Sequence, residues 1–523
     1  MENINHAEQK RDEPRSFGDS GKEIAPSGGH PDSDNPLRGQ VSMANDSKLG
    51  VPALAALVVG AMIGGGIFSL PQNMAQDASA CAVLIAWIIT GTGIFFLANT
   101  FRILAAVKPD ATTGIYAYSM LGFGKFAGFQ MAWAYWLSNI FGNVGYAVLL
   151  MDALNYFFPG VFTGGNNLWS IIGGSIVIWV MNYAVLRGIK QAAFLNTVGT
   201  IFKLVPIFLF IIIMAWVFRY GVFTSNFTGA ELLQGIKPLG SLGSQVRSTM
   251  LVTLWAFIGI EGAVVVSARA RSQRDVGKAT VLGFFGCLVI YALLSLLPFG
   301  KMSQHELSLL ANPSTAPLLS DVVAAKWGGV VMNLGVIVAL LTSWLAFTIM
   351  VAQIPFAAAQ DGTFPEMFKK ENSNGSPSVS LWITSLIMQI SLGVVYFANN
   401  AWNTMLSVTS VMVLPAYLGC TLYLWKISRT EEFQEQPGIG RSFAMICGAA
   451  GTIYALWMIY AAGLKYLLMA FVFQVIGIPV YIMARRKAVT GKIMSEKEEL
   501  AAWIMTVVAL LGVILLAMGK IKL

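Results

Sequence analysis

The chain has 523 residues, of which 56% are hydrophobic and only 11% are charged. Soluble proteins carry about 25% charged residues, so this composition excludes an ordinary soluble domain. The formal net charge is +8, but the basic residues lie between apolar runs, where they orient a membrane protein, and do not suggest nucleic-acid binding. The four cysteines are scattered and mostly lie in apolar runs, which favours small buried thiols over disulfides.

The first 47 residues differ from the rest of the chain. They mix both charges with prolines and glycines and show almost no apolar periodicity. Such a segment cannot bury enough apolar surface to offset the entropy of ordering. We therefore expect residues 1–47 to form a disordered cytoplasmic tail, which also lacks the apolar stretch of a secretory signal peptide.

Apolar runs of about 20 residues, the length that crosses a bilayer, recur through the remainder of the chain. They predict an all-α polytopic membrane protein with 12–13 transmembrane helices. The predicted spans are 49–72, 80–104, 124–157, 168–186, 197–219, 247–268, 279–299, 328–358, 379–398, 402–425, 442–462, 464–484 and 501–519.

The basic residues predict the orientation of these spans. If the N-terminus is cytoplasmic, the inner loops hold most of the lysines and arginines, for example Arg269, Arg271 and Arg274 after the sixth span. The outer loops then hold few, as the positive-inside rule requires. We expect a multi-pass protein of the cell (inner) membrane with a cytoplasmic N-terminus.

The first span contains three consecutive glycines, Gly64, Gly65 and Gly66, within the stretch GAMIGGGIFSLP at 60–71. Each costs roughly 1 kcal/mol relative to alanine in a helix interior. Close packing on one neighbouring helix needs small residues about four apart, whereas successive glycines point in different directions. We therefore predict that the helix unwinds here, which a membrane span tolerates only where its backbone is buried in protein or lines a wet cavity.

The sixth span has a similar interruption. In TLWAFIGIEGAVVVSA, at 253–268, Gly259 and Gly262 flank the acidic Glu261. Interrupted spans at matching positions in two halves of a chain point to a transporter site. Spans one and six match if a unit of five spans is repeated with inverted topology.

Unwound backbone predicts the chemistry of the ligand. The amides of Gly65 and Gly66 can bind a carboxylate at the start of a half-helix. Unpaired carbonyl oxygens, expected at Met62, Trp255 and Ile258, can accept from an ammonium group. A site with both features suits a zwitterionic α-amino acid.

The stretches GAMIGGGIFSLPQNMA, TLWAFIGIEGA and AAAQDGTFP (357–365) resemble the amino acid–polyamine–organocation (APC) superfamily. From about Lys48 to about Lys520, the chain is most similar to the basic amino acid/polyamine antiporters of arginine–ornithine type. The resemblance implies a LeuT-like 5+5 inverted repeat with discontinuous spans 1 and 6. It places a ten-helix inverted-repeat transport core at 48–426 and peripheral C-terminal transmembrane helices at 427–523.

The resemblance also implies site residues. The family's glycine element falls on Gly64 to Gly66, and the aromatic residue that covers the substrate falls on Trp255. Asn139 and Asn143 lie one turn apart in the third span, YWLSNIFGNVGYAVLL, with which relatives contact the distal end of the substrate side chain. Tyr146 lies nearby.

Two spans leave alternatives open. The aromatic residue of the eighth span is Trp344 or Phe347, of which Trp344 is the predicted gate residue. The tenth span, SVTSVMVLPAYLG, has Ser410 as the predicted substrate contact, and its other polar candidates are Ser407, Thr409 and Tyr417.

Ionisable residues inside spans are costly, so each is a functional hypothesis. Glu261 is predicted to be a gate or proton-sensing carboxylate, alternatively a structural one bonded to Tyr135. Lys203, in TIFKLVPIF, either tethers the spans and carries a coupling proton, or snorkels to the headgroups. Asp152 is predicted to be interfacial, and Asp361 to tie down the inner end of the eighth span.

These features predict a secondary active transporter that exchanges cationic amino acids, arginine for ornithine, by alternating access. The alternatives are proton-coupled uptake, exchange of an amino acid for its decarboxylation product (lysine/cadaverine, histidine/histamine), or an amino acid sensor that does not transport. No phosphate loop or metalloprotease motif occurs, so we expect no enzyme and no cofactor. The expected partners are amino acid substrates and the lipid bilayer, without nucleic acid, and a homodimer is common in the resembled family.

Overall fold

The computed structural model describes residues 51–109, 111, 115–188, 192–230, 238–261, 273–486 and 492–520. These residues form helices joined by turns, without a β-strand in the described part. Nine helices of this part are long and apolar enough to cross a membrane. The predicted all-α polytopic fold is confirmed, whereas the predicted tail at 1–47 lies outside the described residues.

Each predicted span has a helical counterpart. The first span is divided among α2 (Val51–Met62), the 3-10 helix η1 (Gly65–Ser69) and α3 (Leu70–Ala75). The others are α4 (Ala80–Val107), α6 (Lys125–Asn155), α7 (Leu168–Leu186), α8 (Ala192–Val217), α10 (Leu242–Ala256), α12 (Gln273–Leu296), α15 (Lys326–Gln360), α16 (Ser378–Val395), α17 (Ala401–Ile427), α18 (Arg441–Arg486) and α19 (Glu496–Ala517).

The eleventh and twelfth predicted spans form one long element, α18, which is broken at Gly463 with φ 74°. Shorter helices that the apolar runs do not predict lie in the connections. They are α5 (Ile115–Phe123), α9 (Tyr220–Ser225), α13 (Gln304–Ser308), α14 (Thr315–Val322) and the 3-10 helices η2 (Thr163–Gly165), η4 (Leu297–Gly300) and η5 (Glu366–Lys369).

The first span is broken where its three glycines predict. Helix α2 ends at Met62, Ile63 and Gly64 are not helical, and a 3-10 helix begins at Gly65. Gly64 has extended backbone, with φ −94° and ψ −177°. The sixth span unwinds as well: α10 ends at Ala256, turns follow through residue 261, and Gly259 has φ 105°, a value that favours glycine. Gly262 lies outside the described residues.

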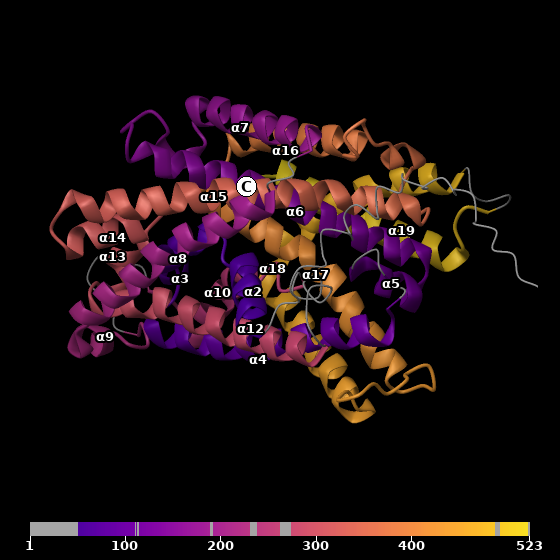
Figure 1. Cartoon of the computed structure of the whole chain (residues 1–523), viewed down its shortest axis with the longest axis horizontal. Coiled ribbons are helices and arrows are strands. Elements are labelled where there is room, and N and C mark those ends of the chain that lie inside the picture. The colour runs from indigo at the N-terminus through magenta and orange to yellow at the C-terminus, as the bar shows by residue number, and fades with distance from the viewer. Residues whose placement is uncertain are drawn as a thin grey trace, which may run out of the picture. The chain divides into compact units, whose positions relative to one another are not determined.

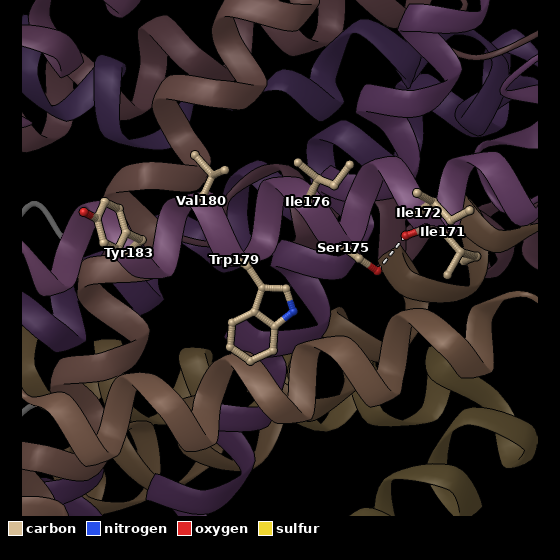
Figure 2. A pocket seen from close by; sticks show the side chains of 7 residues that line it. All are labelled: Ile171, Ile172, Ser175, Ile176, Trp179, Val180 and Tyr183. Atoms are coloured by element: carbon tan, nitrogen blue, oxygen red, sulfur yellow. Dashed lines mark hydrogen bonds between the residues drawn. The ribbon is translucent and has the colours of Figure 1, made fainter.

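Helices α7 and α16 lie side by side along one face of the bundle (Figure 1). Their shared face is polar at a few points: Asn182 donates to the hydroxyl of Ser385 at 2.6 Å, and Trp179 donates to Gln389 at 3.1 Å. A groove of about 610 Å³ runs along α7, lined by Ile171, Ile172, Ser175, Ile176, Trp179, Val180 and Tyr183 (Figure 2). None of the predicted site residues lines it.

Candidate functional site

Two side chains replace backbone donors that the break in the first span removes. In a continuous α-helix, the carbonyl oxygens of Gly60 and Met62 would accept from the amides four residues further on. Instead, Nζ of Lys203 donates to the Gly60 oxygen at 2.7 Å, and Oη of Tyr291 donates to the Met62 oxygen at 3.0 Å. The break is therefore satisfied by protein groups, as a span inside a bilayer requires.

The hydrogen bond to Gly60 shows where the side chain of Lys203 lies. Its side chain is 1% exposed and joins α8 to the first span, so it does not reach the headgroups by snorkelling. Tyr291 on α12 was not predicted, because one tyrosine in an apolar run carries no distinguishing signal. The Met62 oxygen, predicted to accept from a substrate ammonium, already has a protein donor and keeps one lone pair for a second.

Each of the three glycines faces a different element. A Cβ on Gly64 would lie 2.7 Å from Oη of Tyr146 on α6. A Cβ on Gly65 would meet the side chain of Leu340 on α15, and one on Gly66 would overlap the indole of Trp255 on α10. Packing therefore needs glycine at all three positions, in three directions. The predicted break is present, so packing alone does not explain the triplet, but packing requires all three glycines as well.

Trp255 covers the first-span break. Its indole lies against Gly66 and meets the ring of Trp402 edge-on, with centroids 5.3 Å apart and planes at 86°. Beyond Trp255, the backbone continues in tight turns: the Ile258 amide donates to the Trp255 oxygen at 3.1 Å. That oxygen, predicted to be available to a substrate ammonium, is thus partly used by the turn itself.

Helix α6 places two asparagines side by side in the buried interior. The side-chain amide of Asn139 donates to the Tyr135 carbonyl at 2.7 Å, which leaves its Oδ1 without a partner among the described residues. Neither polar side-chain atom of Asn143 has a hydrogen-bond partner within the described part, and Oγ1 of Thr409 on α17 lacks one too. Gly142, next to Asn143, faces Thr409, since a Cβ there would lie 3.5 Å from the threonine methyl.

Helix α15 presents three residues at helical spacing. Leu340 faces Gly65, and Phe347 meets the Tyr146 ring edge-on at 5.8 Å. Trp344 lies between them in the i, i+4, i+7 pattern of one helix face, fully buried, and its Nε1 has no partner within the described residues. Both candidates for the eighth-span aromatic residue therefore lie on the face that turns toward the first-span break.

Glu261 accepts three hydrogen bonds. Tyr135 donates to one carboxylate oxygen at 2.7 Å, and Tyr417 donates to the other at 2.8 Å. The amide of Gly259 adds a third bond at 3.1 Å. The carboxylate thus joins α6, the unwound sixth span and α17, so the predicted contact with Tyr135 is present and Tyr417 is a second partner.

Two other predicted residues have local structural contacts. The hydroxyl of Ser410 donates to the carbonyl oxygens of Leu406 and Leu251, at 2.8 and 2.9 Å. These contacts tie α17 to α10 and occupy its donor. Asp361, at the end of α15, accepts from the Thr363 amide at 3.0 Å and from the Tyr116 hydroxyl at 3.4 Å.

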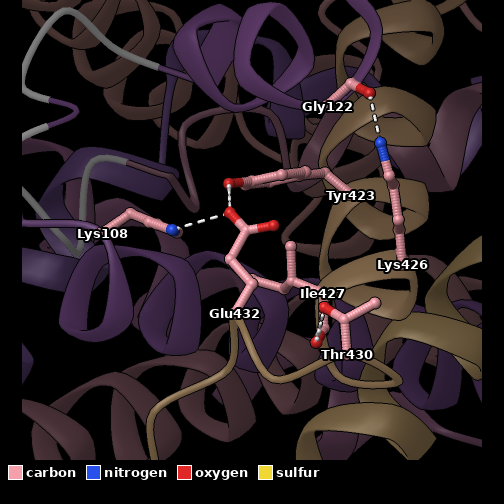
Figure 3. Close-up of polar contacts among 7 residues, drawn as sticks. All are labelled: Lys108, Gly122, Tyr423, Lys426, Ile427, Thr430 and Glu432. Atoms are coloured by element: carbon pink, nitrogen blue, oxygen red, sulfur yellow. Dashed lines mark hydrogen bonds and ion pairs between the residues drawn. The ribbon is translucent and has the colours of Figure 1, made fainter.

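The ends of α4, α5 and α17 are joined by a cluster that no motif predicted (Figure 3). Nζ of Lys108 lies 2.7 Å from Oε1 of Glu432, and Oη of Tyr423 donates to the same oxygen at 3.0 Å. Lys426 donates to the Gly122 carbonyl at 2.9 Å. The hydrogen bond from Lys108 lowers the pKa of Glu432 below its ordinary value.

A membrane-embedded helical bundle whose first and sixth spans both unwind beside buried aromatic and amide side chains defines a multi-pass transporter rather than an enzyme. Residues 49–510 match the family model of amino acid permeases, and the chain belongs to that family, within the APC superfamily.

Three relatives cover nearly the whole of the matched region. An arginine/agmatine antiporter of Chlamydia pneumoniae is 55% identical over 479 residues, 91% of this chain and 99% of that protein. One of Chlamydia abortus is 54% identical over 486 residues, 92% of this chain and all of that protein. An amino-acid transporter homologue of Clostridium perfringens is 56% identical over 478 residues, 91% of this chain and 99% of that protein.

Proposed function

We propose that this chain is an antiporter that takes up arginine in exchange for agmatine, the amine left when arginine loses its carboxyl group. The names of the chlamydial relatives support this substrate pair. The observation that carries the proposal is the broken first span, whose Gly66 lies directly under Trp255. Ornithine, the counter-substrate first expected, is retained as the second candidate in the test below.

We assign the backbone of the first span to the α-carboxylate. The 3-10 helix begins at Gly65, so the amides at its start have no acceptor within their own helix, and the helix dipole favours a negative charge there. Close approach of a ligand requires small residues at this point. Agmatine lacks a carboxylate and would leave these amides without an anion, which gives the site a basis for distinguishing the two substrates.

We assign the distal side of the site to the guanidinium group. Trp255 offers an indole face, on which a cation is stabilised by about 0.5–2 kcal/mol. Oδ1 of Asn139, Oδ1 of Asn143 and Oγ1 of Thr409 are buried acceptors without partners in the described part of the chain. Buried polar atoms in native proteins are normally paired, and the N–H donors of a guanidinium suit these oxygens.

We assign Lys203, Glu261, Tyr135 and Trp344 to the conformational cycle rather than to direct binding. Lys203 holds the first-span break, and Glu261 holds α6 and α17 together through Tyr135 and Tyr417. We further propose a cytoplasmic N-terminus in the cell membrane. In that orientation Glu261 and its tyrosines close the inner end of the pathway, and the α3 end of the first span faces outward.

The charge of the counter-substrate gives the sharpest test. Arginine carries one net positive charge at neutral pH and agmatine carries two, whereas ornithine carries one. Exchange of external arginine for internal agmatine therefore moves a positive charge outward, and exchange for ornithine moves none.

The experiment uses purified full-length chain in liposomes loaded with agmatine, ornithine or buffer, with labelled arginine outside and a clamped membrane potential. We expect uptake with internal agmatine that accelerates when the interior is made positive. Potential-independent uptake that needs internal ornithine would select the second candidate. Uptake into buffer-loaded liposomes driven by a proton gradient, or binding without uptake, would refute exchange.

A further inference from the structure

A cluster of four side chains joins the α3 part of the first span to the start of α17. The side-chain amide of Asn73 donates to Oδ1 of Asn403, and the Nε1–H of Trp402 donates to Oδ1 of Asn73 at 3.1 Å. Asn403 in turn donates to Oε1 of Gln76 at 2.5 Å. We call Asn73, Gln76, Trp402 and Asn403 the outer cluster. No motif in the sequence distinguishes these residues, and none was assigned a role.

Trp402 has a second contact, which leads into the binding site. It is 3% exposed, and its ring meets Trp255 edge-on at 5.3 Å. Trp255 in turn lies on Gly66. Trp402 thus contacts both the outer cluster and the indole that lies against Gly66.

Helix α3 is held differently by its two neighbours, the segment 304–314 and α17. Towards residues 304–314, α3 is held through backbone groups: the Gln72 amide donates to the Ser314 hydroxyl at 3.1 Å, and Gln304 donates to the Ala75 carbonyl at 2.5 Å. Towards α17, the contacts of the outer cluster join side chains only. The outer cluster therefore joins α3 to α17 through side chains alone, and non-helical backbone at Ile63 and Gly64 separates α3 from α2.

We infer that Trp402 is a positioning residue that couples Trp255 to the outer cluster, so that the outer end closes when substrate is seated beneath Trp255. This inference rests on the proposed function, because it takes Trp255 as the residue that covers the substrate. When Trp255 is displaced, the Trp402 ring loses its edge contact, and its bond to Asn73 is released with it. The outer cluster itself consists of neutral amide and indole groups.

The chain offers a matched control for Trp402. Trp179 on α7 also donates its Nε1–H to a side-chain amide oxygen at 3.1 Å, that of Gln389, and also meets a second tryptophan, Trp382, at 5.7 Å. Replacement by phenylalanine removes the same bond and keeps an aromatic ring in both cases. Only Trp402→Phe affects the outer cluster.

The test measures how fast a cysteine below the outer cluster reacts with a thiol reagent that cannot cross the membrane. Met405→Cys is the reporter, since Met405 is 8% exposed and lies one turn beyond Trp402 on α17. It is placed in a Cys81→Ala background, because the other native cysteines are buried. Labelling from outside is measured in liposomes with and without arginine, for the parent, Trp402→Phe and Trp179→Phe.

We expect Trp402→Phe to label about three- to tenfold faster than the parent, the range for loss of one hydrogen bond. Arginine should slow labelling of the parent and of Trp179→Phe, and should no longer slow labelling of Trp402→Phe. This loss of protection separates coupling from mere destabilisation, which would lower the melting temperature without changing the effect of arginine. Arginine affinity should fall by the factor by which arginine slows labelling of the parent, because coupling between binding and closure is reciprocal.

Asn403→Ala repeats the test if Trp402→Phe does not fold, since it breaks the cluster and leaves both tryptophans in place. It should also label faster than the parent. The inference is overturned if Trp402→Phe, or Asn403→Ala in its place, labels at the rate of Trp179→Phe and retains protection by arginine. If the parent exchanges neither agmatine nor ornithine for arginine, the proposed function fails, but faster labelling of Asn403→Ala without substrate would still show that the cluster closes this end.

Discussion

The ammonium of Lys203 donates to the carbonyl oxygen of Gly60 at 2.7 Å, where the amide of Gly64 would donate in an unbroken helix. The unwound first span is therefore held open by a buried side chain from α8. Tyr291 has the same role at Met62. The carbonyl oxygens that the break leaves without a backbone donor thus accept hydrogen bonds from buried side chains.

We predict that Lys203→Met slows arginine exchange at least tenfold and lowers the melting temperature in detergent. The Gly60 carbonyl would be left buried without its donor, which costs about 1–3 kcal/mol. Tyr291→Phe should act in the same direction through Met62. Phe202→Met, next to Lys203 but 58% exposed, is the control and should change neither quantity. Wild-type exchange and stability in Lys203→Met would contradict this role.

We predict that Gly66→Ala weakens arginine binding in the same way as Trp255→Ala. The added methyl overlaps the indole, so Trp255 must leave its position over the break. Losing the cation–π contact weakens binding roughly two- to thirtyfold, as measured by equilibrium binding of labelled arginine. Gly393→Ala on α16 adds the same methyl where nothing lies within 4 Å and should leave affinity unchanged. Normal affinity in Gly66→Ala would show that Trp255 does not cover the substrate.

The spans and both breaks could be predicted because they are encoded locally. Run length gives the spans, and a glycine triplet or a glycine beside Glu261 weakens a helix whatever surrounds it. The residues on other helices that contact the two unwound segments, directly or through Trp255, could not be predicted in this way. Tyr291 and Trp402 are ordinary residues in sequence, and their roles come from helices that meet only in the folded bundle.

The glycine triplet shows the same limit within one motif. The three glycines predict a weak helix. A larger side chain at each position is also excluded by a different neighbour, namely Tyr146, Leu340 or Trp255, and these three lie on separate helices. The group of buried polar atoms at Asn139, Asn143 and Thr409 has a similar origin. Asn139 and Asn143 are implied by the family resemblance, whereas Thr409 is matched to them only by the packing of α6 against α17.

We predict that Tyr417→Phe and Tyr135→Phe each slow exchange several-fold while arginine affinity measured from outside stays within about threefold. Each substitution removes one donor to Glu261, a bond to a charged group that contributes about 1.5–3 kcal/mol, and so weakens closure of the inner end. Tyr460→Phe, on the exposed surface of α18, is the control. Full exchange in both variants would mean that Glu261 and its tyrosines do not take part in the cycle.

We predict that the Lys108–Glu432 ion pair makes a small, pH-dependent contribution to stability. The pKa of Glu432 is lowered by the hydrogen bond from Lys108, so the contribution is present above the ordinary carboxyl pKa and is lost as pH falls through the lower, folded-state pKa. Because the Glu432 side chain is 45% exposed, the effect should be about 1 kcal/mol or less and should weaken with salt. Melting curves of wild type and Glu432→Gln should differ slightly at pH 7 and converge in acid. A difference that grows in acid would contradict the assignment.

The central claim is that the unwound first span binds the α-carboxylate of arginine with backbone amides. A cryo-electron microscopy map of the chain in lipid nanodiscs with bound arginine tests it most directly. We expect the carboxylate within hydrogen-bonding distance of the Gly65 and Gly66 nitrogens, with the guanidinium under Trp255 and toward Asn143. A continuous α-helix through these glycines, or arginine bound elsewhere in the bundle, would contradict the claim.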